Sequence, residues 1–306
     1  MTGSLPLLIA YALDLAFGEP PNAIHPVAWM GTVIARGKRW ALVGSPIAQL
    51  ARGAVLALAV PSASAAVAYA LIRAVHRLSL LELIVTVLLL KPMFAVRALG
   101  AAAFRVRDAL ERQDIVAARR ALGSLCSRRA DELDAEQLVA ATIESVAENT
   151  SDSFIAPLLF FAFAGVPGAA FYRATNTLDA MVGYHGTLEY AGKASARLDD
   201  LANLVPARVT ASLLLVAGLL RGESLSGGVR VLLRDARKTE SPNAGWPMAA
   251  MAGLLGVRLE KVEHYALGDA TRSLSADRIT AAWRVASLAC TLAVGIAVCT
   301  WYWVAT

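Results

Sequence analysis

The sequence predicts an all-α, polytopic helical integral membrane protein, with about five spans, a short N-terminal helix and a cytosolic helical insert. Of its 306 residues, 57% are hydrophobic and only 17% are charged, whereas soluble domains average about 45–50% apolar and about 25% charged residues. The mean hydropathy is +0.54. The chain has no strand-like alternation of useful length and no internal repeat. We therefore treat residues 1–306 as a single membrane-embedded domain.

Five apolar stretches account for the predicted spans. They are residues 55–72, 78–90, 154–172, 201–220 and 285–306. The last stretch contains no charge and is long enough to cross the hydrocarbon core.

An earlier apolar stretch covers residues 5–17. It is shorter than the roughly 17 residues that a span needs, and it contains Asp14. It also lacks a basic leader and is followed by GEPP rather than by a small-residue cleavage site. We expect a retained re-entrant or short membrane helix, not a signal peptide.

The loop charges predict the orientation. Residues 31–52, 91–152 and 221–284 carry four, nine and ten Lys or Arg, whereas residues 73–77 and 173–200 carry two and three. Because basic loops remain in the cytoplasm, we place the three basic segments there and the C-terminal end across the membrane. The membrane surface is a sufficient partner for the net charge of +5, so no nucleic acid is expected.

The polar residues 91–153 read as the cytosolic helical insert. Asp134 begins a D-x-x-Q capping box, and the helix that it starts is expected to run to about Glu148. The apolar side chains of that helix fall on one face, and Glu144 and Glu148 on the other.

Three acids recur at a spacing of four residues: Glu144, Glu148 and Asp152. Like charges at this spacing repel each other on a helix, so a cation such as Mg²⁺ would explain their proximity. The alternative is an ordinary solvated helix face.

Two further segments, residues 173–208 and 221–284, are expected to be polar loops that form a site. The first contains the following polar residues: Arg173, Asn176, Asp179, Arg197, Asp199, Asp200, Asn203 and Arg208. The second contains Arg237 and Lys238, which suit a polyanion such as a nucleotide, although basic cytoplasmic loops have the same composition. The four histidines and three cysteines lack metal-ligand spacing, and no P-loop or G-x-G-x-x-G motif is present.

Several sequence blocks resemble one family. They are ESVAENTSD at 144–152, YRATNTLDAMVGY at 172–184, ARLDDLANLVPAR at 196–208, DARKTESPNAGWPMAAMAG at 235–253, and DLAFGEPP with HPVAWMG within 14–31. In order and spacing they resemble the adenosylcobinamide-phosphate synthase family of cobalamin biosynthesis, called CobD or CbiB. The resemblance extends from about residue 14 to about residue 268.

The resemblance implies a multi-pass enzyme of the cell inner membrane whose site faces the cytoplasm. Such an enzyme uses ATP to join a carboxyl group of adenosylcobyric acid to (R)-1-amino-2-propanol or its O-phosphate, forming an amide. ATP and Mg²⁺ are the expected cofactors, and the corrinoid is a substrate. Whether the amine is phosphorylated, and whether the chain forms a homo-oligomer or associates with other corrin-pathway enzymes, is left open.

This chemistry suggests roles for the polar residues. Metal ligands and the base are expected among Glu144, Glu148, Asp152, Asp179, Asp199 and Asp200, with Glu148 and Asp152 as the Mg²⁺ ligands. Phosphates and the activated carboxyl are expected to face Arg173, Arg208, Arg237 and Lys238. Neutral groups are expected to be oriented by Asn176, Asn203 and Asn243. Trp246 would stack on adenine or the corrin rim, or would anchor at the interface. Further substrate-binding candidates are Asp14, Glu19 and His25.

One topological question follows. If residues 154–172 cross the membrane completely, residues 173–200 lie outside, away from ATP. The AGVPG sequence at 164–168 predicts a break that could make a re-entrant hairpin or a short broken helix. Alternatively, the loop folds back into the membrane domain.

A helical transporter is the competing class, because broken helices and intramembrane charge suit it equally well. Its path would use Asp14, Glu82 and Arg208, without an ATP site. A membrane anchor for other corrin enzymes is a third hypothesis.

Overall fold

The computed structural model describes residues 3–126, 130–184 and 186–305. The chain forms two compact units, which we describe separately. The first consists of the described residues of Met1–Ala95, Ala156–Asn203 and Ala297–Thr306, and the second of those of Val96–Ile155 and Leu204–Ile296.

Membrane-length helices dominate the described chain. Four helical stretches are long and apolar enough to cross a membrane: Pro46–Val75, Ser79–Glu111, Ala135–Val182 and Ala276–Trp303. A fifth is obtained if Gly186–Ala202 and Leu204–Leu220 count as one broken span. The prediction of an all-α polytopic protein with about five spans is therefore confirmed. The expected short N-terminal helix is also present, at Ser4–Phe17.

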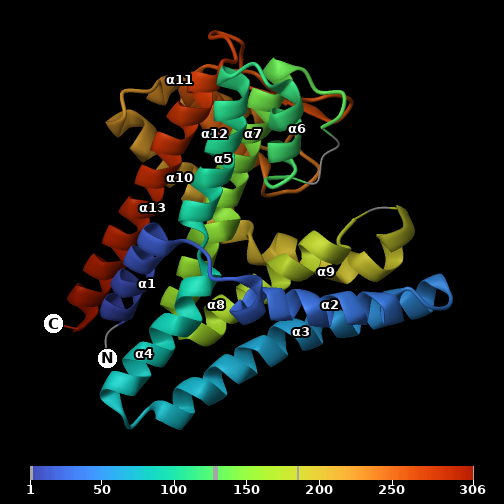
Figure 1. The fold of residues 1–306 in the computed structure, drawn as a ribbon, viewed down its shortest axis with the longest axis vertical. Helices are drawn as coiled ribbons and strands as arrows, with labels where there is room; N and C mark the ends of the chain where they lie inside the picture. Colours follow the sequence, from blue (N-terminus) through green and yellow to red (C-terminus); the bar gives the residue numbers. More distant parts are fainter. Residues whose placement is uncertain (1–2, 127–129, 185, 306) are drawn as a thin grey trace. The chain divides into compact units, whose positions relative to one another are not determined.

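The first unit begins with four α-helices and two 3₁₀ turns. These are α1 (Ser4–Phe17), η1 (Asn22–Ile24), α2 (Pro26–Ala41), α3 (Pro46–Val75), α4 (Ser79–Leu90) and η2 (Lys91–Met93). The starts of α2 and α3 follow from local sequence, because each has proline in its first turn and a side-chain cap before it. Helices α2 and α3 run side by side (Figure 1).

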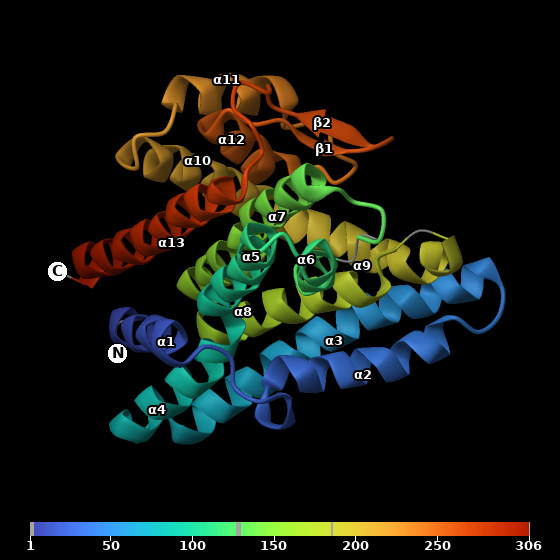
Figure 2. The same cartoon turned by 45° about the horizontal axis from the view of Figure 1, so that its top comes forward.

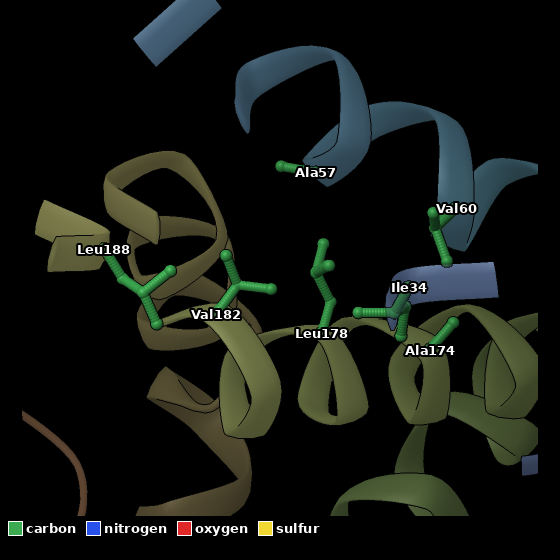
Figure 3. Close-up of a cluster of buried hydrophobic side chains, with 7 residues drawn as sticks. All are labelled: Ile34, Ala57, Val60, Ala174, Leu178, Val182 and Leu188. Carbon is green, nitrogen blue, oxygen red and sulfur yellow. The ribbon is translucent and has the colours of Figure 1, made fainter. Parts of the chain in front are cut away.

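The remainder of the first unit is α8 (Ala156–Val182), η4 (Gly186–Leu188) and α9 (Glu189–Ala202). Side chains of α2, α3, α8 and η4 meet in an apolar cluster, shown in Figure 3: Ile34, Ala57, Val60, Ala174, Leu178, Val182 and Leu188. Helix α9 approaches α3 so closely that a Cβ at Gly53 would overlap the carbonyl oxygen of Ala191. This packing fixes the second half of α8 and α9, which carry the aspartates considered below.

Helix α8 is not one straight rod. Its backbone leaves the helical region at Ala164 (φ −131°, ψ 18°) and at Gly165 (φ 64°, ψ −159°). A Cβ at Gly168 would overlap the carbonyl oxygen of Phe160, although residues eight apart in a straight helix are separated by about 12 Å along the axis. The rings of Phe160 and Tyr172 are also only 5.1 Å apart. The chain therefore folds back at Ala164–Gly165, which confirms the predicted break and gives it the form of a hairpin.

The described residues of the second unit form seven α-helices, one π-helical turn and a two-stranded hairpin. These are α5 (Val96–Glu111), α6 (Ile115–Leu122), α7 (Ala135–Thr150), η3 (Ser151–Ile155), α10 (Leu204–Leu220), α11 (Leu225–Asp235), α12 (Gly245–Leu255), β1 (Leu259–Lys261), β2 (Tyr265–Leu267) and α13 (Ala276–Ala305), whose last residues belong to the first unit. Helices α11 and α12 lie side by side, and β2 contacts α12 (Figure 2). The strands pair antiparallel, with Leu259 opposite Leu267.

The predicted capping box at Asp134 is confirmed. The Asp134 carboxylate accepts a hydrogen bond from the Gln137 amide at 2.8 Å, and the Gln137 side chain accepts one from the Asp134 amide at 2.9 Å. By contrast, the expected polar face of α7 is wrong for Glu144, which is only 4% exposed. Helix α7 is packed against α5, α6 and α12, so the side of the helix that carries Glu144 is covered as well.

The expected polar loop at 173–208 is also wrong. Residues 173–182 continue α8, and most of the remaining segment is α9. The segment 221–284 contains α11, α12 and the β-hairpin rather than loop alone, and the hairpin itself was not expected. Residues 91–153 contain helices, as expected for the insert. Their place in the cytosol stays a prediction.

Candidate functional site

Two aspartates of the first unit lie near each other, and one of them, Asp199, is part of a hydrogen-bonded group. Asp179 comes from α8 and Asp199 from α9. The Asn203 side-chain amide donates to Asp199 Oδ2 at 2.9 Å, and Asn176 also hydrogen-bonds the Asp199 side chain. Tyr172 donates its hydroxyl hydrogen to Asn203 Oδ1 at 2.8 Å. The packing of α8 against α9 thus brings together three residues of one block and two of the next.

Each of these aspartates keeps one carboxylate oxygen without a partner. Oδ1 of Asp179 and Oδ1 of Asp199 are buried and accept no hydrogen bond from any described residue. The two carboxylates are close enough to repel each other. Buried carboxylate oxygens without donors are costly, and two neighbouring negative charges favour a cation between them. The geometry therefore suits a positively charged ligand.

One other predicted residue, Asp200, lies near enough to this pair to repel both carboxylates. Asp200 follows Asp199 on α9, and Arg197 Nη1 lies 3.9 Å from its Oδ2. Arg173 lies on α8, three residues before Asn176. Asp200 thus adds negative charge near the aspartate pair, and the roles of Asp200, Arg197 and Arg173 stay predictions.

The N-terminal candidates form a second group in the first unit. His25 Nδ1 accepts a hydrogen bond from the Val27 amide at 3.2 Å, so the hydrogen that it shares with Glu19 belongs to Nε2. Lys91 Nζ lies 3.4 Å from Glu19 Oε1 and 3.6 Å from Asp14 Oδ1. Asp14 is 0% exposed, and Lys91 supplies its counter-charge. Lys91 was not among the predicted residues, because nothing local links it to a carboxylate 77 positions away.

In the second unit, Arg208 joins the candidates from the segment 221–284. Its Nη1 donates to Asn243 Oδ1 at 2.5 Å, and its guanidinium carbon lies 4.6 Å from the centre of the Trp246 ring. Arg237 is near enough to repel it. Two guanidinium groups, an amide and an indole thus form a basic group of the kind that holds phosphate. The guanidinium of Arg208 lies over the indole ring of Trp246.

Lys238 has a different neighbour. Its Nζ lies 2.6 Å from Asp235 Oδ1, and Asp235 is 0% exposed. Burial alone would raise the pKa of the Asp235 carboxyl, but hydrogen bonds from Arg234, Lys238 and the Gly268 amide outweigh it and hold this pKa well below its usual range. The predicted role of Lys238 at phosphate thus competes with its role as a counter-charge.

The three predicted acids at 144–152 lie on α7 and η3 of the second unit. Among the residues that the structure describes, no group of three or more His, Cys, Asp or Glu is placed to hold a metal ion. Mg²⁺ characteristically uses one or two carboxylates and completes its octahedron with water and substrate phosphates. Glu148 and Asp152 are carboxylates of the type that Mg²⁺ uses, and their role as its ligands stays a prediction. Helix α7 ends at Thr150 and Asp152 lies in the π-helical turn that follows, so Asp152 does not continue the α-helical face that carries Glu144 and Glu148.

The fold and these residues define a helical membrane protein that carries buried or half-buried groups of opposite charge. The model of the CobD/Cbib protein family matches residues 7–296. The chain therefore belongs to the CobD/CbiB family, as the sequence blocks indicated.

Curated relatives agree with this assignment. A cobalamin biosynthesis protein CobD from Dehalococcoides mccartyi is 43% identical over 268 residues, covering 87% of each chain. A probable cobalamin biosynthesis protein CobD from Methanothermobacter thermautotrophicus is 42% identical over 283 residues, covering 92% of each. The cobalamin biosynthesis protein CbiB of Salmonella typhimurium is 36% identical over 303 residues, covering 94% of each. No solved structure matches the chain. Family membership supports a role in cobalamin biosynthesis.

Proposed function

We propose that the protein is an ATP-dependent amide ligase that joins a carboxyl group of adenosylcobyric acid to (R)-1-amino-2-propanol or its O-phosphate. The observation that carries the proposal is the pair of buried, unpartnered oxygens on Asp179 and Asp199. An amine substrate arrives as an ammonium ion, which must be held and then deprotonated before its nitrogen can attack a carbonyl carbon. Neighbouring carboxylates suit both tasks.

In this proposal each group of residues has one task. ATP with Mg²⁺ would supply the activation of the corrinoid carboxyl, with Glu148 and Asp152 as the protein ligands of the metal. Asp179 and Asp199 hold the ammonium group, and one of them accepts its proton. Arg208 and Arg237 neutralise phosphate charge, and Asn243 fixes the Arg208 guanidinium through its hydrogen bond.

The hairpin in α8 supports a site on the cytoplasmic side of the cell inner membrane. Because the chain folds back at Gly165, residues 173–200 return toward the side on which α8 begins. A straight span would instead carry them to the opposite side. The positive-inside rule assigns the basic segments to the cytoplasm, where ATP is present.

The test is a reaction of the purified protein in detergent or nanodiscs. Adenosylcobyric acid, MgATP and either amine are supplied, and the amide and ADP are measured by mass spectrometry. We expect an amide with one of the two amines and a large loss of rate in Asp199→Asn. Glu260→Gln is the matched control, because Glu260 is exposed and pairs with Arg258. If folded protein that binds corrinoid produces neither amide nor ADP, the ligase proposal fails.

A transporter is the second candidate, favoured by the broken helix α8 and the buried Asp14–Lys91 pair. It predicts corrinoid uptake into proteoliposomes without amide formation. The same purified protein distinguishes the two functions.

A further inference from the structure

Tyr172 lies behind the aspartate pair, on the second arm of the α8 hairpin. It is 0% exposed, and its ring packs against Phe160 on the first arm, with 5.1 Å between the ring centres. Its hydroxyl donates to Asn203 Oδ1, and the amide of Asn203 donates to Asp199 Oδ2. The two hydrogen bonds, at 2.8 and 2.9 Å, thus connect the hairpin to the carboxylate of Asp199.

The direction of these hydrogen bonds decides the orientation of Asn203. An asparagine amide has one acceptor end and one donor end of nearly equal size, so a buried asparagine can turn over unless its partners distinguish the two ends. Tyr172 provides a donor for the oxygen, and Asp199 provides an acceptor for the nitrogen. Both partners therefore favour the same orientation. Asn203 is itself only 3% exposed, so water is a poor substitute for either partner.

This orientation determines which oxygen of Asp199 is available. Asn203 engages Oδ2, while Oδ1 stays buried without a donor, as does Oδ1 of Asp179. Without the tyrosine hydroxyl, the amide of Asn203 loses the contact that holds its oxygen end. The carboxylate of Asp199 would then be held by Asn176 alone, so its orientation would be less restricted.

We propose that Tyr172 is a positioning residue for substrate amine, acting through Asn203 to hold the Asp199 carboxylate against the ammonium group. The inference rests on the proposed ligase function and adds a residue that does not itself contact substrate. Tyr172 thus connects the packing of the two arms of α8 with the orientation of the Asp199 carboxylate.

The test compares Tyr172→Phe with Tyr184→Phe in the amide-forming reaction. The first variant keeps the ring that packs on Phe160 and removes only the hydroxyl, and the second removes an exposed hydroxyl from the same block. One hydrogen bond has a net worth of about 0.5–1.5 kcal/mol, or up to about tenfold in affinity. We expect KM for the amine to rise about fivefold to tenfold in Tyr172→Phe, with KM for adenosylcobyric acid unchanged. Tyr184→Phe should match the wild type.

A double-mutant cycle separates positioning from packing. If Tyr172 acts through Asn203, adding Tyr172→Phe to Asn203→Ala should change KM for the amine less than twofold. Multiplied effects of the two substitutions would overturn the inference, as would an unchanged KM in Tyr172→Phe. Should Tyr172→Phe fail to fold, Asn203→Ala takes its place. It removes the donor to Asp199 without adding a charge, so an unchanged KM for the amine there would also overturn the inference.

The wild type and Tyr184→Phe show which proposal has failed. If neither makes an amide, the ligase function and the inference both fail. If both make it and Tyr172→Phe has normal amine kinetics, only the positioning role fails.

Discussion

Gly165 offers a direct test of the α8 hairpin. At φ 64° and ψ −159° its backbone occupies a region that is essentially restricted to glycine. Replacement by alanine should therefore destabilise the folded protein by about 1–3 kcal/mol. At about 2–4 °C per kcal/mol for a chain of moderate size, the melting temperature should fall by about 2–12 °C.

The assay is thermal unfolding of the purified protein in detergent, followed by tryptophan fluorescence. Gly295→Ala is the control, because Gly295 lies in helix α13 and a Cβ there meets nothing within 4 Å. That variant should be neutral, or stabilised by up to about 1 kcal/mol through better helix propensity. Equal melting temperatures for Gly165→Ala and the wild type would refute the hairpin geometry.

Three further predictions concern charged residues. Lys91→Met should destabilise the protein by about 3–5 kcal/mol, because it removes the counter-charge of buried Asp14. Adding Asp14→Asn should recover much of the lost stability. If thermal unfolding shows instead that the two substitutions destabilise the protein additively, this prediction is contradicted. The pKa of Asp235 in the folded protein lies below its unfolded value of about 3.9. Its contribution to the stability of the folded protein is therefore complete above about pH 5 and is lost as the pH falls below about 4. The difference in melting temperature between wild type and Asp235→Asn should therefore narrow from pH 7 to pH 3, and a constant difference would count against this. Arg208→Lys keeps the charge but loses the guanidinium over Trp246, so KM for ATP should rise about tenfold. The control variant Arg258→Lys should keep the wild-type KM for ATP. Normal ATP kinetics in Arg208→Lys would exclude the role of Arg208 in neutralising phosphate charge.

Features that depend on neighbouring residues could be predicted from the sequence. The capping box at Asp134 involves residues three positions apart, and the turn at Gly165 follows from glycine and proline within one short segment. Apolar length is also local, so the class of fold followed from it.

Features that depend on distant residues could not be predicted. Glu144 is buried because other helices cover more than one side of α7, and periodicity within α7 does not contain that information. Asp14 meets Lys91 only after the chain has folded. The polar residues of α9 suggested a loop because their composition resembles one, whereas packing against α3 and α8 holds them in a helix. The β-hairpin at 259–267 has strands of three residues, too short for a readable alternation.

The turn at Gly165 also constrains how this part of the chain enters the bilayer. The arm that precedes it, from Ala156 to Ala164, rises about 13 Å at 1.5 Å per residue, less than half of the hydrocarbon thickness of about 30 Å. This arm alone is too short to be a stop-transfer segment. We expect it to be retained once the second arm has packed against it, with Tyr172 on Phe160. If the two arms enter the membrane together in this way, substitutions at Gly165 or Gly168 should reduce the yield of inserted protein in addition to any effect on activity.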